Sequence, residues 1–198
     1  MHRRCSVALA HETHSYPVRE RMYEIDDLDR VIELSTAPQS DVGAPLPLVV
    51  SDEHHLLLAY LVSEPDPAWD GTYVTMVSPE SDGLPIAIIQ FCWPSAHMFG
   101  PPNDEAFGGH PLASRGLSPY AVFEVENSSW IRRHERMNSV HRSHNRERFL
   151  ARRKHFIFAF HDSTFECIAQ GFEVSMLRGS MRSAAARMVE MLAARPTG

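Results

Sequence analysis

The side chains best suited to acid–base chemistry lie between His155 and Gln170. Apolar and polar residues alternate there on both sides of Asp162–Ser163, which predicts a β-hairpin turning at those two residues. In that register His161 and Glu166 share the face opposite the phenylalanines. A carboxylate beside an imidazole orients the ring and raises its pKa, so the pair can transfer protons. We therefore expect His161 to act as the acid or base and Glu166 to orient it.

A second carboxylate, Glu124, belongs to the predicted strand Tyr120–Glu126, where polar and apolar side chains alternate. If the apolar sets of both segments line one core, Glu124 shares the polar face of His161 and Glu166 and becomes a third catalytic candidate. The solvent-facing side of an ordinary antiparallel sheet shows the same alternation, so the pattern leaves both interpretations open.

The segment Pro94–Pro119 is long and rich in proline and glycine, yet it also carries aromatic residues that a linker seldom contains. Long loops within a compact domain are usually functional. Turn formation alone would also explain its Pro-Asn-Asp sequence. On the functional interpretation, four of its residues bind or position the substrate: Asn103, Asp104, Glu105 and His110.

The chain contains 12 histidines, three of them in a helix expected from Ser128 to about His144. His134, Asn138 and His141 follow one another at helical spacing there, which could place them on one face for a divalent metal. Scattered surface histidines are the alternative. The sequence has no phosphate-loop or dinucleotide-binding motif, so it identifies no nucleotide cofactor and leaves a metal open.

The order of elements predicts a single α+β domain spanning residues 1–198. Consecutive hairpins with few β-α-β units indicate a mainly antiparallel sheet with about three helices packed on it. We expect a first strand at Cys5–Ala10, a helix at Asp26–Ser35 and a final helix capped by Ser180.

Composition indicates a cytoplasmic protein with no membrane partner. No run of about 18 apolar residues occurs, and the apolar stretch near the start is shorter than a signal-peptide core of roughly 7–15 residues. The three cysteines are far apart and form no Cys-x-x-Cys pair, so neither a disulfide framework nor a zinc knuckle is indicated.

Charge is unevenly distributed along the chain. Met1–Trp130 carry 6 basic and 19 acidic residues (−13), and Ile131–Gly198 carry 13 and 6 (+7), which together give the net charge of −6. The two halves could attract each other within one fold or across a homodimer, or either could meet a charged partner. The basic run Arg142–His155 has few aromatic residues, so nucleic-acid binding is not favoured.

Two hypotheses follow. The first is a small cytoplasmic enzyme that acts on a small polar molecule by histidine–carboxylate acid–base chemistry, with or without a metal. The alternative is a non-catalytic binding or immunity-type protein that recognises a partner through its acidic first half or its basic helix. The sequence itself defines neither the substrate nor the reaction class.

Overall fold

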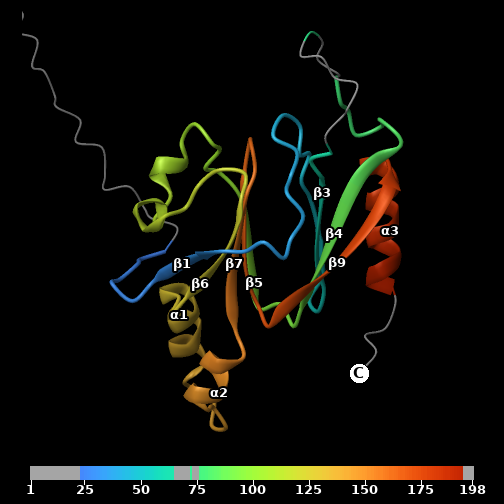
Figure 1. The fold of residues 1–198 in the computed structure, drawn as a ribbon. Helices are drawn as coiled ribbons and strands as arrows, with labels where there is room; N and C mark the ends of the chain where they lie inside the picture. The colour runs from blue at the N-terminus through green and yellow to red at the C-terminus, as the bar shows by residue number, and fades with distance from the viewer. Residues whose placement is uncertain (1–22, 65–71, 73–75, 194–198) are drawn as a thin grey trace, which may run out of the picture.

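Two antiparallel β-sheets lie face to face, with helices and loops on their outer sides (Figure 1). The computed structural model describes residues 23–64, 72 and 76–193. The strand expected at Cys5–Ala10 lies outside these residues. The α+β class, the antiparallel pairing and the number of α-helices, three, are confirmed for the described part of the chain.

The first sheet has five strands in the spatial order β1-β6-β7-β8-β5. Its central strands, β7 and β8, are the two arms of the predicted hairpin. Because they pair on both sides, their backbone groups are satisfied within the sheet. In spatial order the strands are β1 (Arg30–Glu33), β6 (Val122–Glu126), β7 (Lys154–Ala159), β8 (Thr164–Ala169) and β5 (Ala96–Gly100).

The second sheet has four strands in the order β2-β3-β4-β9. Every residue of β3 is buried, because one face meets the first sheet and the other meets a helix. The strands are β2 (Leu48–Ser51), β3 (Leu56–Leu61), β4 (Leu84–Cys92) and β9 (Gly171–Gly179).

Of the three α-helices among the described residues, two lie on the outer sides of the sheets, one on each, and the third lies at the lower end of the first sheet in Figure 1. Helix α3 (Met181–Ala193) lies on the second sheet and buries Met181, Ala184 and Met188 against it. Ser180 caps it, since its hydroxyl accepts a hydrogen bond from Ser183 N at 3.1 Å, as expected from the sequence. Beside the first sheet lie α1 (Ser129–Asn138), α2 (Arg146–Ala151) and the 3₁₀ turns η1 (Phe107–Gly109) and η2 (Ala113–Arg115).

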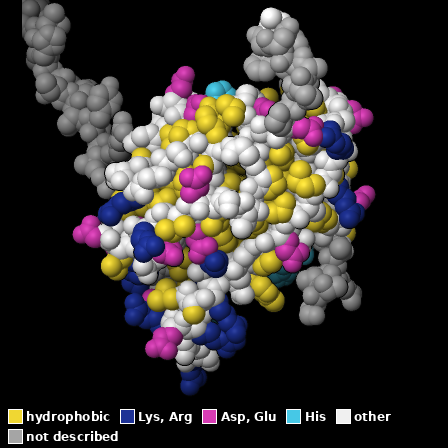
Figure 2. Space-filling model, in the orientation of Figure 1, with side chains coloured by type: hydrophobic (Ala, Val, Ile, Leu, Met, Phe, Trp, Pro, Cys, Tyr) yellow, Lys and Arg dark blue, Asp and Glu magenta, His cyan; other side chains and the backbone are white. Residues whose placement is uncertain are grey.

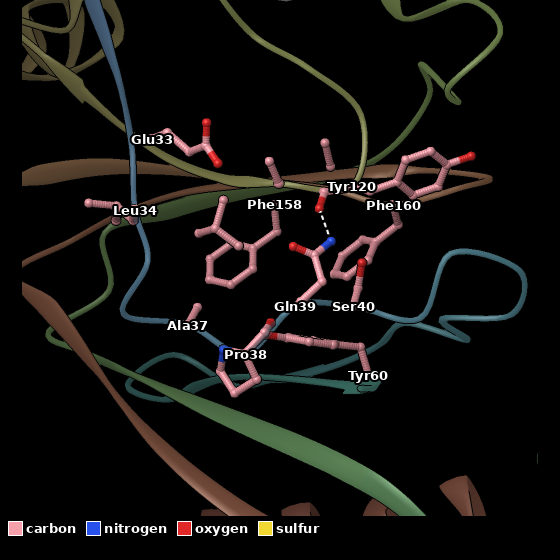
Figure 3. Close-up of a pocket in the computed structure, with 13 residues that line it drawn as sticks. Glu33, Leu34, Ala37, Pro38, Gln39, Ser40, Tyr60, Tyr120, Phe158 and Phe160 are labelled. Atoms are coloured by element: carbon pink, nitrogen blue, oxygen red, sulfur yellow. Dashed lines mark hydrogen bonds between the residues drawn. The ribbon is translucent and has the colours of Figure 1, made fainter. Parts of the chain in front are cut away.

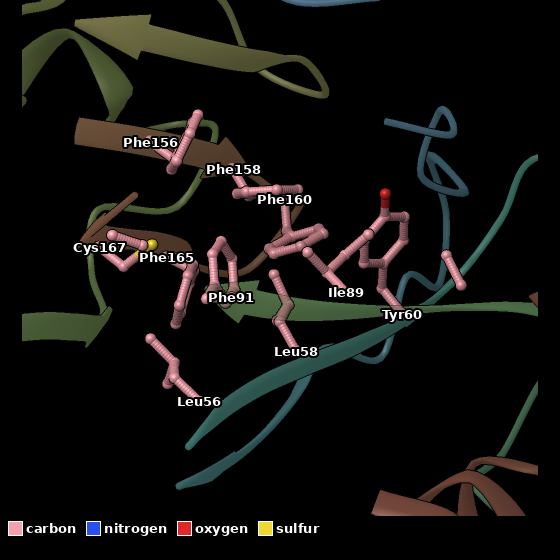
Figure 4. Packing of buried hydrophobic residues seen from close by; sticks show 12 residues of the cluster. Leu56, Leu58, Tyr60, Ile89, Phe91, Phe156, Phe158, Phe160, Phe165 and Cys167 are labelled. Carbon is pink, nitrogen blue, oxygen red and sulfur yellow. The ribbon is translucent and has the colours of Figure 1, made fainter. Parts of the chain in front are cut away.

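The layer between the sheets is rich in aromatic rings (Figure 4). The Phe91 ring lies 5.4 Å from that of Phe165 and 5.9 Å from that of Phe158, measured between ring centroids. These contacts join the middle strands of both sheets. Burial of such large rings is the main stabilising contribution expected in a domain of this size.

The hairpin prediction is confirmed in its faces but not in its turn. The loop comprises four residues, Phe160–Ser163, instead of Asp162 and Ser163 alone, and Phe158 pairs with Phe165. A hydrogen bond of 2.9 Å from Phe160 N to Ser163 O closes this wider loop. The register differs from the predicted one by two residues, which leaves every side chain on its expected face.

The helix predicted at Asp26–Ser35 is wrong, because this segment forms a turn followed by β1. Asp26 Oδ1 accepts a hydrogen bond from Leu28 N, and Asp29 Oδ2 accepts one from Asp26 N. Aspartates that bond nearby backbone groups compete with a helix. The β-branched residues that follow then pair with β6.

Candidate functional site

Glu166 lies at the centre of a fully buried polar cluster. Its Oε2 accepts hydrogen bonds of 2.8 Å from Tyr23 Oη and from His155 Nε2. Its Oε1 accepts one of 3.0 Å from His110 Nε2. The side chains of Glu166 and both histidines have 0% exposure. The carboxylate is therefore satisfied by three donors from three separate segments.

Further hydrogen bonds hold the rings of the two histidines that contact Glu166. His110 Nδ1 accepts a hydrogen bond of 3.1 Å from Leu112 N, which leaves the proton on the Nε2 that faces Glu166. His155 Nδ1 lies 3.0 Å from the hydroxyl of Ser128, which also accepts from Ile131 N at the start of α1. The cluster is thus bonded directly to the N-terminus of α1.

Aromatic rings close the cluster from water. Trp130 stacks on Tyr23 with 5.7 Å between ring centroids and meets His155 edge-on at 5.0 Å. Burial disfavours the charge of Glu166, but the hydrogen bonds from His110 and His155 outweigh it and lower its pKa to about 2. Burial first, and then the neighbouring carboxylate, raise the pKa of Tyr23 well above its usual value.

This geometry joins parts of the fold and leaves no opening to Glu166. The carboxylate links β8 to β7, to the loop that carries His110, and to the segment before β1 at Tyr23. Its hydrogen-bonding capacity is directed entirely to protein donors. In this conformation the cluster can position other elements, but a substrate cannot reach it.

A second histidine–carboxylate cluster lies near the surface, at the β7–β8 loop. His161 Nδ1 donates to Asp104 Oδ2 over 2.9 Å. The Tyr120 hydroxyl donates to the same oxygen and lies 3.1 Å from His161 Nδ1. The His161 side chain is 40% exposed and that of Asp104 is 16% exposed. The imidazole is therefore held from one side and open on the other.

Backbone contacts hold this second cluster in place. Asp104 N donates to the His161 carbonyl at 2.9 Å, and the Thr164 hydroxyl donates to the Pro102 carbonyl at 2.8 Å. Asn103 Oδ1 accepts from Ala106 N at 3.0 Å and thereby forms a turn. The loop after β5 is thus bonded to the hairpin at several points, which fixes Asp104 beside the imidazole.

The electrostatics of this cluster suit proton transfer. The hydrogen bond to Asp104 raises the pKa of His161 above its usual value. The hydrogen bonds from Tyr120 and then from His161 lower the pKa of Asp104. Within the described part of the chain, His161 Nε2 has no hydrogen-bond partner. An imidazole bonded to a carboxylate through Nδ1 with a free Nε2 can accept or donate a proton at the surface.

The predicted site residues fall into three separate places. His161 meets Asp104, with Asn103 and Glu105 on the adjoining turn, whereas Glu166 meets His110. The expected contact between His161 and Glu166 is absent, because these residues belong to the two different clusters. Glu124 is in neither: it lies opposite Phe156, on the other face of the sheet from Glu166, and pairs with Lys154 Nζ at 2.8 Å.

Sequence reasoning missed three residues that complete the clusters. Tyr23 contacts the buried cluster from a position that no local pattern marks. Tyr120, expected only as the first residue of a strand, contacts the surface cluster. Ser128 was identified only as a possible helix cap. The alternation predicted for the hairpin also places His155 on the face of Glu166, where the structure has it, and its period-two spacing from His161 is the signal that could have singled it out.

The helical histidine face predicted after Ser128 does not form. Helix α1 ends at Asn138, whose Nδ2 donates to the His134 carbonyl, so His141 lies beyond the helix. The turn that follows carries His144, which bonds to Glu135 instead. Among the described residues, no group of three or more His, Cys, Asp or Glu side chains is arranged to hold a metal ion.

A small cavity lies between the sheets near Tyr120 (Figure 3). Its volume is about 30 Å³, room for one or two water molecules at most. Gln39 Nε2 donates to the Tyr120 carbonyl at its side. The Tyr120 ring points away from this cavity, and its hydroxyl contacts the surface cluster instead. The cavity is therefore too small for a substrate and separate from the His161 imidazole.

Basic side chains gather over α1 and α2 at one end of the molecule, as Figure 2 shows. A hollow of about 350 Å³ between these helices is lined by Arg148, Arg152 and Arg153, among other residues. Arg148 and Arg152 form no ion pair with any described carboxylate, so their charges are free to meet an anion.

The chain matches no known protein family, no curated protein sequence and no solved structure. The fold and the two clusters define it as an α+β protein with one buried and one surface histidine–carboxylate site. None of the helices within the described residues is both long and apolar enough to cross a membrane.

Proposed function

We propose that this protein is a small cytoplasmic enzyme in which His161 acts as general acid or base on a small polar substrate. The observation that carries the proposal is the contact between His161 Nδ1 and Asp104 Oδ2, which orients an exposed imidazole. Positioned imidazoles with a tuned pKa are common proton-transfer groups in enzymes.

The roles of the neighbouring residues follow from their contacts. Asp104 positions the ring and stabilises its protonated form. Tyr120 shares the same carboxylate oxygen and so limits rotation of Asp104. Glu105 is exposed on the adjoining turn and Asn103 shapes that turn, which places both within the region a bound substrate would occupy.

The buried cluster supports this site indirectly. Glu166 binds His110 in the same long loop that carries Asp104, so it anchors that loop on the sheet. Glu166 is therefore a positioning residue in this proposal, and Glu124 has no part in it, because its partner Lys154 lies elsewhere.

The test combines a chemical screen with histidine titration. The protein would be screened against chromogenic esters, phosphate esters and lactones. Any activity found should fall at least ~100-fold in His161→Gln, as expected for loss of a general acid or base. His54→Gln, the same change at an exposed histidine, should leave it unchanged. Full activity in His161→Gln would refute the proposal.

The effect of Asp104 on the pKa of His161 can be measured separately. NMR titration of the His161 ring should give a pKa above the usual histidine value of about 6.5, and Asp104→Asn should lower it. Since the base form exists only above this pKa, general-base activity should rise with pH through it. An unshifted pKa in the native protein would show that Asp104 does not hold the ring.

A second candidate function is recognition of an acidic protein segment by the α1–α2 surface. Part of the charge asymmetry is internal, as shown by ion pairs such as Arg132 with Asp26 at 2.5 Å. Arg148 and Arg152 remain uncompensated beside the hollow between the helices. A polyglutamate peptide should bind with salt-dependent affinity. Arg148→Glu/Arg152→Glu should abolish binding, whereas Arg187→Glu on α3 should not.

A further inference from the structure

Strand β9 is an open edge of the second sheet. It spans nine residues, Gly171–Gly179, and pairs with β4 along its whole length. On its other side no strand lies among the described residues. The opposite edge strand, β2, has only four residues. Long unpaired edges readily accept another strand, whereas short edges are one of the ways proteins avoid this.

The register shows which backbone groups of β9 point outward. Asp52 N bonds to the His55 carbonyl and Val62 N to the Pro85 carbonyl, which sets the alternation of bonded pairs across β2, β3 and β4. Odd-numbered residues of β4 therefore bond to β3, and its even-numbered residues bond to β9.

This alternation continues into β9. Its odd-numbered residues, such as Ser175 opposite Ile88, carry the bonds to β4. The outward N–H and C=O groups consequently belong to the even-numbered residues, and no described residue bonds to them. They are Phe172, Val174, Met176 and Arg178.

The exposed side chains at the centre of this edge are apolar on one face, that of Val174 and Met176, and polar on the other, that of Glu173 and Ser175. Val174 is 37% exposed and Met176 is 53% exposed. The strand contains neither proline nor lysine, which often protect edges, and its charged residues are Glu173 and Arg178. The edge therefore offers both free backbone hydrogen-bonding groups and apolar surface to an added strand.

We propose that β9 pairs with β9 of a second copy of this chain, antiparallel about a two-fold axis at Ser175. This register places Val174 opposite Met176 of the other copy, so that the exposed apolar side chains meet in pairs. It also places Phe172 opposite Arg178. The Phe172 ring packs into the aromatic layer and the Arg178 guanidinium is bonded to Glu64 and the Gly83 carbonyl, so this pair contributes backbone hydrogen bonds only.

The choice of register follows from the count of outward residues. With the axis at Ser175, all four outward residues of each copy find a bonded partner. Moving the axis to Val174 leaves Arg178 outside the paired region, and moving it to Met176 leaves Phe172 outside. The two-fold pairing uses the β9 edge of both copies, so no further copy can add there and the assembly closes as a dimer with one eight-stranded sheet.

Sedimentation equilibrium of the full chain tests this proposal. At about 100 µM, a concentration at which even a weak standard interface is populated, the native protein should sediment at twice the 22.4 kDa mass of one chain. Met176→Lys should halve that mass, because it places two ammonium groups in the paired edge. Val189→Lys, at a comparably exposed apolar residue of α3, should remain dimeric.

A second variant separates the edge from the folded core. Val174→Pro removes only an outward N–H and leaves the bonds to β4 intact, so the variant should keep its circular dichroism spectrum and become monomeric. A monomeric native protein at this concentration would overturn the proposal. So would a dimer that persists in both Met176→Lys and Val174→Pro.

Discussion

His155 Nε2 donates to Glu166 Oε2 over 2.8 Å, diagonally across the central strands β7 and β8. The contact lies on the face of the sheet that turns away from the aromatic layer, under Trp130 and Tyr23. An anionic side chain in that position is tolerated because three donors surround it. Replacing Glu166 should therefore lower the stability of the domain, because it would leave these donors without their acceptor.

Glu166→Gln should destabilise the fold by about 3 kcal/mol, the cost typical of breaking a buried charged pair. The amide keeps the size of the side chain, but its NH₂ group would face a donor from Tyr23, His110 or His155. Urea denaturation measures the change. Glu124→Gln is the matched control, because its exposed pair with Lys154 should contribute no more than about 1 kcal/mol.

The low pKa of Glu166 predicts a loss of stability in acid, which forms the acid limb of the curve of unfolding free energy against pH. The pKa lies at about 2 in the folded protein against an ordinary 4.5, so the folded state binds this proton less readily than the unfolded state. The resulting stabilisation is fully present above pH 4.5 and is lost as pH falls from 4.5 towards 2. Its size is on the order of 3 kcal/mol.

Comparison of two proteins isolates this limb from other titrating groups. The free energy of unfolding would be measured between pH 2 and 7 for the native chain and for Glu166→Gln. The difference between them should shrink as the solution becomes more acidic. A constant difference across this range would show that the pKa of Glu166 is the same in the folded and unfolded states.

Local alternation was enough to predict much of the fold. Period two along His155–Gln170 assigned each hairpin side chain to its correct face, because a strand fixes direction residue by residue. The cap of α3 at Ser180 and the apolar stripe that follows are similarly local. At Asp26–Ser35 the same reasoning failed, since aspartate side chains and pairing with β6 outweighed a helical spacing of apolar residues.

The site itself could be predicted only in part. His161 and Asp104 were both candidates, but their contact depends on how the loop after β5 folds back, which no short-range pattern specifies. The polar face of Glu166 was expected either to line a site or to be the solvent-facing side of the sheet. It is buried because Tyr23, His110 and α1 cover it, and these come from segments distant in sequence.

Ser128→Ala should cost more stability than Ser180→Ala, although both serines cap a helix. Loss of the Ser180 cap should cost about 1 kcal/mol. Ser128 caps α1 and also contacts the buried His155 Nδ1, so its loss should cost roughly 2–3 kcal/mol. Thermal unfolding of the two variants measures this. Equal costs would mean that the contact with His155 contributes nothing.

Tyr23→Phe should destabilise the protein and also raise the pKa of Glu166. Removing the hydroxyl deletes one of three donors to a buried carboxylate, at a cost of roughly 1–3 kcal/mol. The weaker stabilisation of the charge should shift the acid limb to higher pH. Tyr60→Phe removes a hydroxyl that donates to the Pro38 carbonyl and should leave the acid limb unchanged. Identical acid limbs in the native protein and in Tyr23→Phe would contradict the assigned contact between Tyr23 and Glu166.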